Sequence, residues 1–148
     1  MKRYYGPLLG FYTVFLLYMM FYGCGRLPGP VGYLQLHPFR TINMFFSSNV
    51  AAQHFAVNII GNIVVFMPFG WLGLLSQKFF SFPKLLIGFP IAISIIELTQ
   101  YWSHRGTADI DDLFLNTVGM ILGYLFYSLV KYFYEDWMFE RESTIEYA

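Results

Sequence analysis

Four long stretches without charged side chains constrain this sequence most. They cover residues 4–24, 55–77, 85–102 and 113–130, and Glu97 is the one charged residue inside them. A helix of about 20 apolar residues crosses the hydrocarbon core of a bilayer, which is about 30 Å thick. The sequence therefore predicts an all-α membrane protein, built as a bundle of four transmembrane helices in a single domain that covers residues 1–148.

The composition excludes a water-soluble domain. The chain is 57% hydrophobic and 12% charged, whereas a soluble domain is about 25% charged. Nine basic and nine acidic residues cancel, so the charge balance indicates no nucleic-acid partner. The single Cys24 excludes an intrachain disulfide. The first stretch is longer than a signal-peptide core of about 7–15 residues, so we expect a retained helix.

The basic residues near the span ends predict the orientation, because cytoplasmic loops carry an excess of Lys and Arg. An internal N-terminus puts six basic residues inside and three outside, namely Lys2, Arg3, Lys78, Lys84, Lys131 and Arg141 against Arg26, Arg40 and Arg105. We therefore expect both termini in the cytoplasm. Residues 25–54 then form a long, partly ordered external loop with a strand-like piece and a short helix within residues 34–42, and residues 135–148 form an acidic cytoplasmic tail.

Polar side chains gather at the predicted outer ends of three helices. At 1.5 Å per residue, Glu97 and Asn62 both lie about 10 Å below the outer boundary. Residues three, four or seven apart share a helix face, which predicts a single polar stripe on the third helix. The candidate pocket is formed by Asn58 and Asn62 on the second helix, by Glu97, Gln100, Tyr101, His104 and Arg105 at the end of the third, and by Asp109, Asp112 and Asn116 on the fourth, with Asp111 turned aside.

A carboxylate within a span costs about 2.5–3.5 kcal/mol, so Glu97 should be protonated or paired, and Arg105 is the natural partner. Plainer readings stand beside this one. Asp109 and Asp112 fit an N-cap with an acidic third residue. The Asn side chains fit hydrogen bonds between helices, and Gly119 and Gly123 fit a close helix contact. At least seven polar groups converge, however, and this number favours a functional pocket.

His104 and the aspartates offer ligands to a divalent cation. No spacing matches a metal signature, and Arg105 would compete for the carboxylates. No Ser-His-carboxylate order is evident near Ser94 or Thr99. We therefore expect no metal and no cofactor. The prolines within the spans, Pro68 and Pro90, should bend their helices.

Several of these residues occur in a familiar order. Asn62-Ile-Val-Val-Phe-Met-Pro-Phe-Gly70, Glu97-Leu-Thr-Gln100, Arg105, Asp109-Ile-Asp-Asp112, Asn116, Gly119, Gly123 and the loop piece at residues 36–42 resemble the VanZ-like family. The resemblance is strongest over residues 34–126. It implies a bacterial plasma-membrane protein of a family named for a protein that confers resistance to the glycopeptide teicoplanin. The family pattern points to Asn62, Glu97, Gln100, Arg105, Asp109, Asp112 and Asn116.

Three functions fit the sequence. The first is a non-enzymatic factor whose outer pocket binds a lipid or lipid-linked envelope component, with Arg105 on its phosphate, in glycopeptide resistance or envelope homeostasis. The second is a membrane enzyme acting on a lipid-linked substrate, with Glu97, Asp109 or Asp112 as acid and base. The third is a scaffold that docks another membrane protein or a second copy of the chain.

Overall fold

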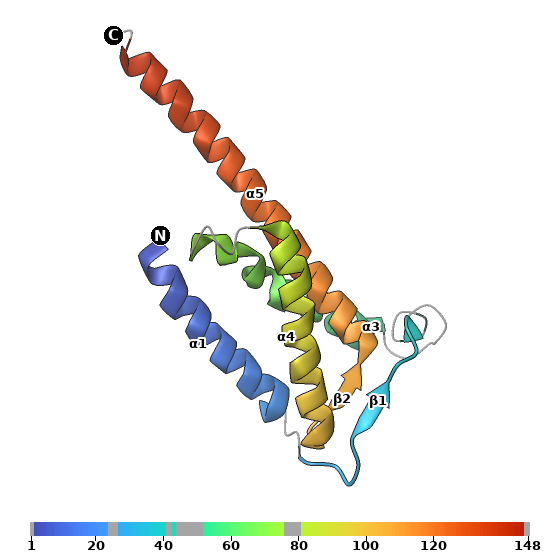
Figure 1. Ribbon diagram of the computed structural model, residues 1–148. Coiled ribbons are helices and arrows are strands. Elements are labelled where there is room, and N and C mark those ends of the chain that lie inside the picture. Colours follow the sequence, from blue (N-terminus) through green and yellow to red (C-terminus); the bar gives the residue numbers. More distant parts are fainter. Residues whose placement is uncertain (1, 24–26, 41–42, 44–51, 76–80, 147–148) are drawn as a thin grey trace.

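The computed structural model describes residues 2–23, 27–40, 43, 52–75 and 81–146 (Figure 1). Cys24, Arg26 and Lys78, together with most of residues 41–51 of the expected loop, lie outside the described residues. The elements follow one another along the chain as α1 (Lys2–Phe21), β1 (Tyr33–Gln35), α3 (Ala52–Phe66), the 3₁₀ helix η2 (Met67–Leu74), α4 (Phe82–Trp102), β2 (Thr107–Asp109) and α5 (Ile110–Glu146).

Three helices are long and apolar enough to cross a membrane. They are the Tyr4–Phe21 part of α1, the whole of α4, and the Ile110–Met138 part of α5. The expected fourth span at residues 55–77 is not supported, because this stretch is divided between α3 and η2. The protein is therefore a mostly helical membrane protein with three candidate spans, and the expected fourth transmembrane helix is not supported.

The division between α3 and η2 comes just before Pro68, which has no backbone N–H to donate to the preceding turn. Two tyrosines of α1 donate hydrogen bonds to backbone carbonyls on either side of this division. The hydroxyl of Tyr12 donates to the Val65 carbonyl at 2.6 Å, and the hydroxyl of Tyr5 donates to the Pro68 carbonyl at 2.5 Å. Backbone carbonyls that leave a helical ladder inside a membrane need such partners. The two tyrosines thus stabilise the break and tie α1 to η2.

Close backbone contacts join α5 to α3 and η2. A Cβ added to Gly119 would lie 2.2 Å from the Ile63 carbonyl oxygen, and one added to Gly123 would lie 1.9 Å from the Met67 carbonyl oxygen. Glycine at both positions lets the helix backbones approach where no side chain fits. The predicted close helix contact at Gly119 and Gly123 is therefore confirmed.

The hydrophobic core lies between the helices. Leu16 of α1, Phe66 of α3, Ile93 of α4 and Met120 of α5 are all buried in it. Phe89 of α4 packs its ring against Phe66 at 5.9 Å between centroids. Aromatic rings at this spacing bury a large area and prefer edge-to-face or offset contacts. The core thus fixes the helices below the polar residues.

The protein also contains a short parallel sheet, so it is mostly but not entirely helical. Tyr33 of β1 pairs with Thr107, and Gln35 pairs with Asp109 of β2. The expected strand-like piece in the loop is therefore present, and it begins one residue before the predicted segment. Its partner strand lies in the link between α4 and α5. This sheet ties the loop to the end of the bundle at which α4 ends and α5 begins (Figure 1).

Residues 135–146 of the expected acidic tail are helical and continue α5. α5 continues from Ile110 to Glu146 as one helix of 37 residues and extends well beyond the other elements (Figure 1). At 1.5 Å per residue its length is about 56 Å, which exceeds the roughly 30 Å core of a bilayer. An i,i+4 ion pair between Lys131 and Glu135, 3.5 Å long, lies on this extension.

Candidate functional site: a polar cavity at one end of the bundle

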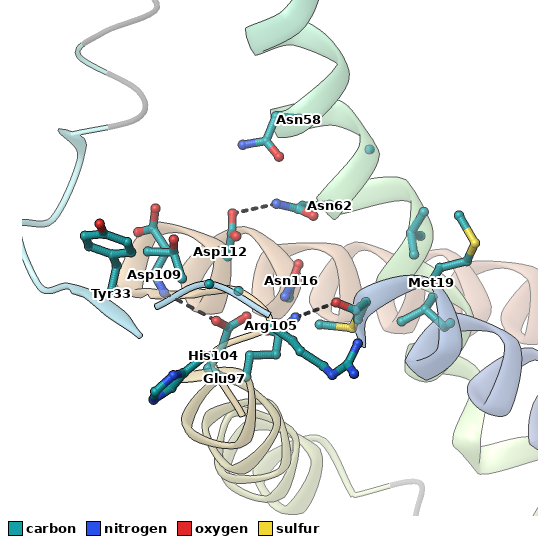
Figure 2. A pocket seen from close by; sticks show the side chains of 18 of the residues that line it. Met19, Tyr33, Asn58, Asn62, Glu97, His104, Arg105, Asp109, Asp112 and Asn116 are labelled. Carbon is teal, nitrogen blue, oxygen red and sulfur yellow. Dashed lines mark hydrogen bonds between the residues drawn. The ribbon is translucent and has the colours of Figure 1, made fainter. Parts of the chain in front are cut away.

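A partly open cavity of about 810 Å³ lies at the end of the bundle where α1 and α4 end and α5 begins (Figure 2). Its walls come from α1, α3, α4 and α5 and from the loop around β1 and β2. Nine of the ten candidate residues line it: Asn58, Asn62, Glu97, Gln100, His104, Arg105, Asp109, Asp112 and Asn116. Residues that the helix rise places at a similar depth on three separate helices thus line one cavity.

The wall between α3 and α5 is joined by one short hydrogen bond. The Asn62 amide donates from Nδ2 to Oδ1 of Asp112 at 2.7 Å. A charged acceptor makes such a bond shorter and stronger than a neutral one. Gly119, seven residues after Asp112 on α5, allows the two helices to come close enough for this bond. Asn58, one turn before Asn62, also lines the cavity and is exposed.

Glu97 is buried, with 6% of its surface exposed. Its Oε2 accepts a hydrogen bond from the backbone N–H of Asp109 at 3.3 Å. Asp109 in turn accepts from the Asp111 N–H on Oδ1 at 2.9 Å. This last bond goes to the second residue of α5, so Asp109 is its N-cap. Asp109 therefore caps the helix and lines the cavity as well, and the two readings of this residue are compatible.

Arg105 does not form the expected pair with Glu97. Its guanidinium carbon lies 4.4 Å from the ring centroid of Tyr22, just beyond the end of α1. Among the residues that the structure describes, no carboxylate lies within ion-pair distance of this guanidinium. A guanidinium stacked on an aromatic ring keeps its N–H donors at the edge of the plane. The cation of the cavity is therefore held by an aromatic face.

The turn after α4 explains the position of Arg105. Its backbone N–H bonds to the Gln100 carbonyl at 3.1 Å, and that of His104 bonds to the Tyr101 carbonyl at 3.2 Å. These two bonds form a Schellman motif. His104 occupies the left-handed position with φ 56°, which costs about 1–2 kcal/mol for a residue other than glycine. The helix ends at Trp102, and Arg105 leaves it in the direction of α1.

This turn also corrects the predicted polar stripe. The stripe assumed that one helix continues from Glu97 to His104, whereas α4 ends at Trp102. His104 reaches the cavity from the turn instead. Tyr101 is not among the described lining residues, and its backbone carbonyl oxygen would lie 2.3 Å from a Cβ added to Gly32. Tyr101 therefore contacts the loop and not the cavity.

Backbone N–H groups of the loop donate hydrogen bonds to His104 and Asp111, and no sequence pattern predicted these contacts. The Gly29 N–H donates to the His104 carbonyl at 2.8 Å. The Phe39 N–H donates to Oδ1 of Asp111 at 2.6 Å, and Asp111 is 2% exposed. Asp111 thus faces the loop, on another side of α5 from the cavity residues. The helix spacing placed Asp111 aside from the cavity residues but indicated no partner for it.

Gln100 and Asn116 are both buried, but they differ in their hydrogen bonding. Gln100 is 3% exposed, and its amide donates to the Met20 carbonyl at 2.9 Å, which satisfies a carbonyl in the last turn of α1. Asn116 is 1% exposed and lines the cavity. Its side-chain oxygen, however, has no hydrogen-bond partner among the described residues. Buried polar atoms are nearly always paired, so this oxygen is an acceptor that a ligand can use.

The described part of the chain contains no group of three or more His, Cys, Asp or Glu side chains arranged to hold a metal ion. The three carboxylates that line the cavity are instead spread over its walls: Glu97 on α4, Asp109 at the start of α5 and Asp112 beside α3. With Arg105 as the cation, these groups give the cavity an acidic side and a basic side. The arrangement suits a ligand that carries both an anionic group and hydrogen-bond donors.

Comparison with known proteins identifies the family. The family model described as VanZ/LLP1 matches residues 9–131. This range includes the cavity walls contributed by α1, α3, α4 and α5. No curated protein and no solved structure matches the chain. The family match, the three apolar helices and the cavity at their end agree with one another, and the chain is a multi-pass membrane protein that belongs to the VanZ/LLP1 family.

Proposed function

We propose that the polar cavity binds the phosphate-bearing head group of a membrane lipid or of a lipid-linked envelope component. The observation that carries this proposal is the side-chain oxygen of Asn116, which is buried in the cavity wall without a partner among the described residues. An unpaired buried polar atom costs about 1–3 kcal/mol. A hydrogen-bond donor on a ligand would remove this cost.

The charges of the cavity support the same ligand. Arg105 lies on the ring of Tyr22, and no described residue accepts a hydrogen bond from its guanidinium. A guanidinium binds phosphate oxygens with two parallel hydrogen bonds. Glu97 and Asp112 supply acceptors on the other walls. These acceptors would orient the hydroxyl or amine groups of the same head group.

The resemblance to the family suggests the physiological role that we propose. The cavity would open on the outer side of the bacterial plasma membrane, as the distribution of Lys and Arg predicts. Both chain termini would lie in the cytoplasm, because α3 and η2 together return the chain from the end of α1 to the end of the bundle at which α4 begins (Figure 1). A bound lipid or lipid-linked envelope component would then alter how glycopeptides such as teicoplanin engage the cell surface. The protein would act in glycopeptide resistance or envelope homeostasis by binding.

Native mass spectrometry of the full chain in detergent tests the binding. Wild type should retain a phospholipid, and Arg105→Ala should retain about tenfold less, which corresponds to about 1.4 kcal/mol. Arg105→Lys should restore part of the binding because it keeps the charge and loses the fork of donors. Lys131→Ala removes a partly exposed cation on the far part of α5 and serves as the matched control.

Equal lipid retention by Arg105→Ala and Lys131→Ala would overturn the proposal. In cells, Arg105→Ala should lower tolerance of teicoplanin while the amount of protein in the membrane stays constant. A loss of tolerance that follows only a loss of protein would show that Arg105 acts in folding.

A further inference from the structure

A second cavity, of about 610 Å³, lies between α1, η2 and α4. Its lining is almost wholly apolar and includes Leu17, Phe69, Leu72, Leu85, Phe89 and Ile93. Lys84 marks its far end on α4. We call this cavity the apolar groove. An apolar cavity beside a polar one in a membrane protein suits a ligand with two chemically different parts.

The apolar groove adjoins the polar cavity. Leu16 of α1 and Phe66 of α3 line both of them. Both side chains are buried, with 7% and 3% of their surface exposed. Leu16 and Phe66 therefore lie at the boundary between the two cavities, and a ligand that extends from one cavity into the other passes these two side chains.

Specific hydrogen bonds position the helices that form the walls of the groove. Gln100 ties α4 to the Met20 carbonyl at one end of α1, and Tyr12 ties α1 to the Val65 carbonyl. α1 and α4 lie close together at the C-terminal end of α1 and diverge toward its N-terminus (Figure 1). Small residues one turn apart, Gly88 and Ala92, both line the groove on the same face of α4. A Cβ added to Gly88 would meet nothing within 4 Å.

The length of the groove suits one hydrocarbon chain. Its lining on α4 runs from Lys84 to Ile96, which is about 18 Å at 1.5 Å per residue. One leaflet of a bilayer has about half of the 30 Å core, or about 15 Å. The groove is therefore about as long as one leaflet is deep.

The chemical groups along the two cavities have the order of the parts of a phospholipid. The apolar groove lies between α1 and α4, Arg105 lies over Tyr22 just beyond the end of α1, and Asp112 lines the polar cavity from α5. Figure 2 shows Arg105 directed toward α1, with Asp109 and Asp112 on the opposite side. This order corresponds to a hydrocarbon chain, a phosphate and a head group that carries hydrogen-bond donors.

We infer that the ligand of the polar cavity is an amphiphile whose hydrocarbon chain occupies the apolar groove, with its phosphate on Arg105 and a donor-bearing head group against Asp112 and Asn116. This inference rests on the proposed function and adds the chain, its position and the order of the groups. The chain is recognised by the protein and is not merely part of the surrounding bilayer. Ligands with the same head group should therefore be distinguished by whether they carry a chain.

The test uses the purified full chain and two probes with one head group. Oleoyl lysophosphatidylethanolamine carries the chain, and glycerophosphoethanolamine does not. Wild type should bind the first at least about tenfold more tightly than the second. Gly88→Leu places a side chain in the groove. It should weaken the binding of the lysolipid by about tenfold and leave the binding of glycerophosphoethanolamine unchanged.

Gly10→Leu is the matched control. Gly10 lies in α1, is exposed, has nothing within 4 Å of an added Cβ and lines neither cavity. It should bind both probes as wild type does. Ala92→Phe is a second variant that fills the groove, in case Gly88→Leu does not fold. Two further lysolipids show which donors the acidic wall recognises. Oleoyl lysophosphatidylglycerol has a head group with hydroxyl donors, and lysophosphatidic acid has no head group beyond its phosphate.

The outcomes separate the two proposals. Binding of the lysolipid by Gly88→Leu or Ala92→Phe at wild-type strength overturns the inference about the groove. Equal binding of both ethanolamine probes by wild type overturns it as well and leaves the head-group site standing. If wild type binds none of the lysophospholipids and no glycerophosphoethanolamine, the proposed function itself is wrong.

Discussion

The close contact at Gly119 makes the polar cavity sensitive to one methyl group. In Gly119→Ala the new Cβ would lie 2.2 Å from the Ile63 carbonyl oxygen, whereas ordinary contact begins at 3.4 Å. The two helices must therefore separate by about 1.2 Å. The same separation would lengthen the 2.7 Å bond from Asn62 to Asp112 to about 3.9 Å, which is too long for a hydrogen bond.

The expected loss of stability combines two costs. Overpacking of a close contact costs about 1–3 kcal/mol, and a side-chain hydrogen bond inside a membrane contributes about 0.6 kcal/mol. Reversible unfolding in bicelles measures the sum. Gly61→Ala is the control, because Gly61 lies on α3 and a Cβ there would meet nothing within 4 Å. If Gly119→Ala unfolds like Gly61→Ala, the reasoning about the helix contact is refuted.

Three further variants test individual contacts. Tyr12→Phe removes the donor to the Val65 carbonyl and should lower the free energy of unfolding by about 0.6–1.7 kcal/mol; an unchanged value would argue against the tie. Asp111→Ala removes the acceptor of the Phe39 N–H, so hydrogen exchange of that amide should accelerate, and unaltered protection would contradict the loop contact. Lys131→Ala should change stability by less than about 1 kcal/mol, because its ion pair is exposed; a larger loss would contradict this assignment.

The sequence was sufficient to place most of the cavity residues. The rise per residue and the alternating direction of the helices put Asn62, Glu97 and Asn116 at one depth, and the structure has all of them around one cavity. The N-cap at Asp109 and the contact at Gly119 also followed from local rules. These features depend on helix geometry, which is the same in any surroundings.

The features that sequence reasoning missed depend on contacts between distant segments. Pro68 marked a weak point, but the change to a 3₁₀ helix is completed by tyrosines of α1 that bond to the carbonyls around it. The pairing of β1 with β2 joins segments separated by half of the chain, and no local pattern predicts a partner strand. Arg105 stacks on Tyr22 because α4 ends in a Schellman turn, which requires His104 in a conformation that favours glycine.

The central claim is that the polar cavity selects its ligand, and photo-crosslinking in the native membrane tests it directly. A photoreactive side chain is introduced at Asn58, which lines the cavity, and separately at Ile60, which is 59% exposed on the same helix and is not among the residues that line it. The probe at Asn58 should capture one class of phosphate-bearing lipid, while the probe at Ile60 captures lipids in proportion to the membrane. Capture of the same lipid mixture at both positions, or of a protein at Asn58, would contradict the account.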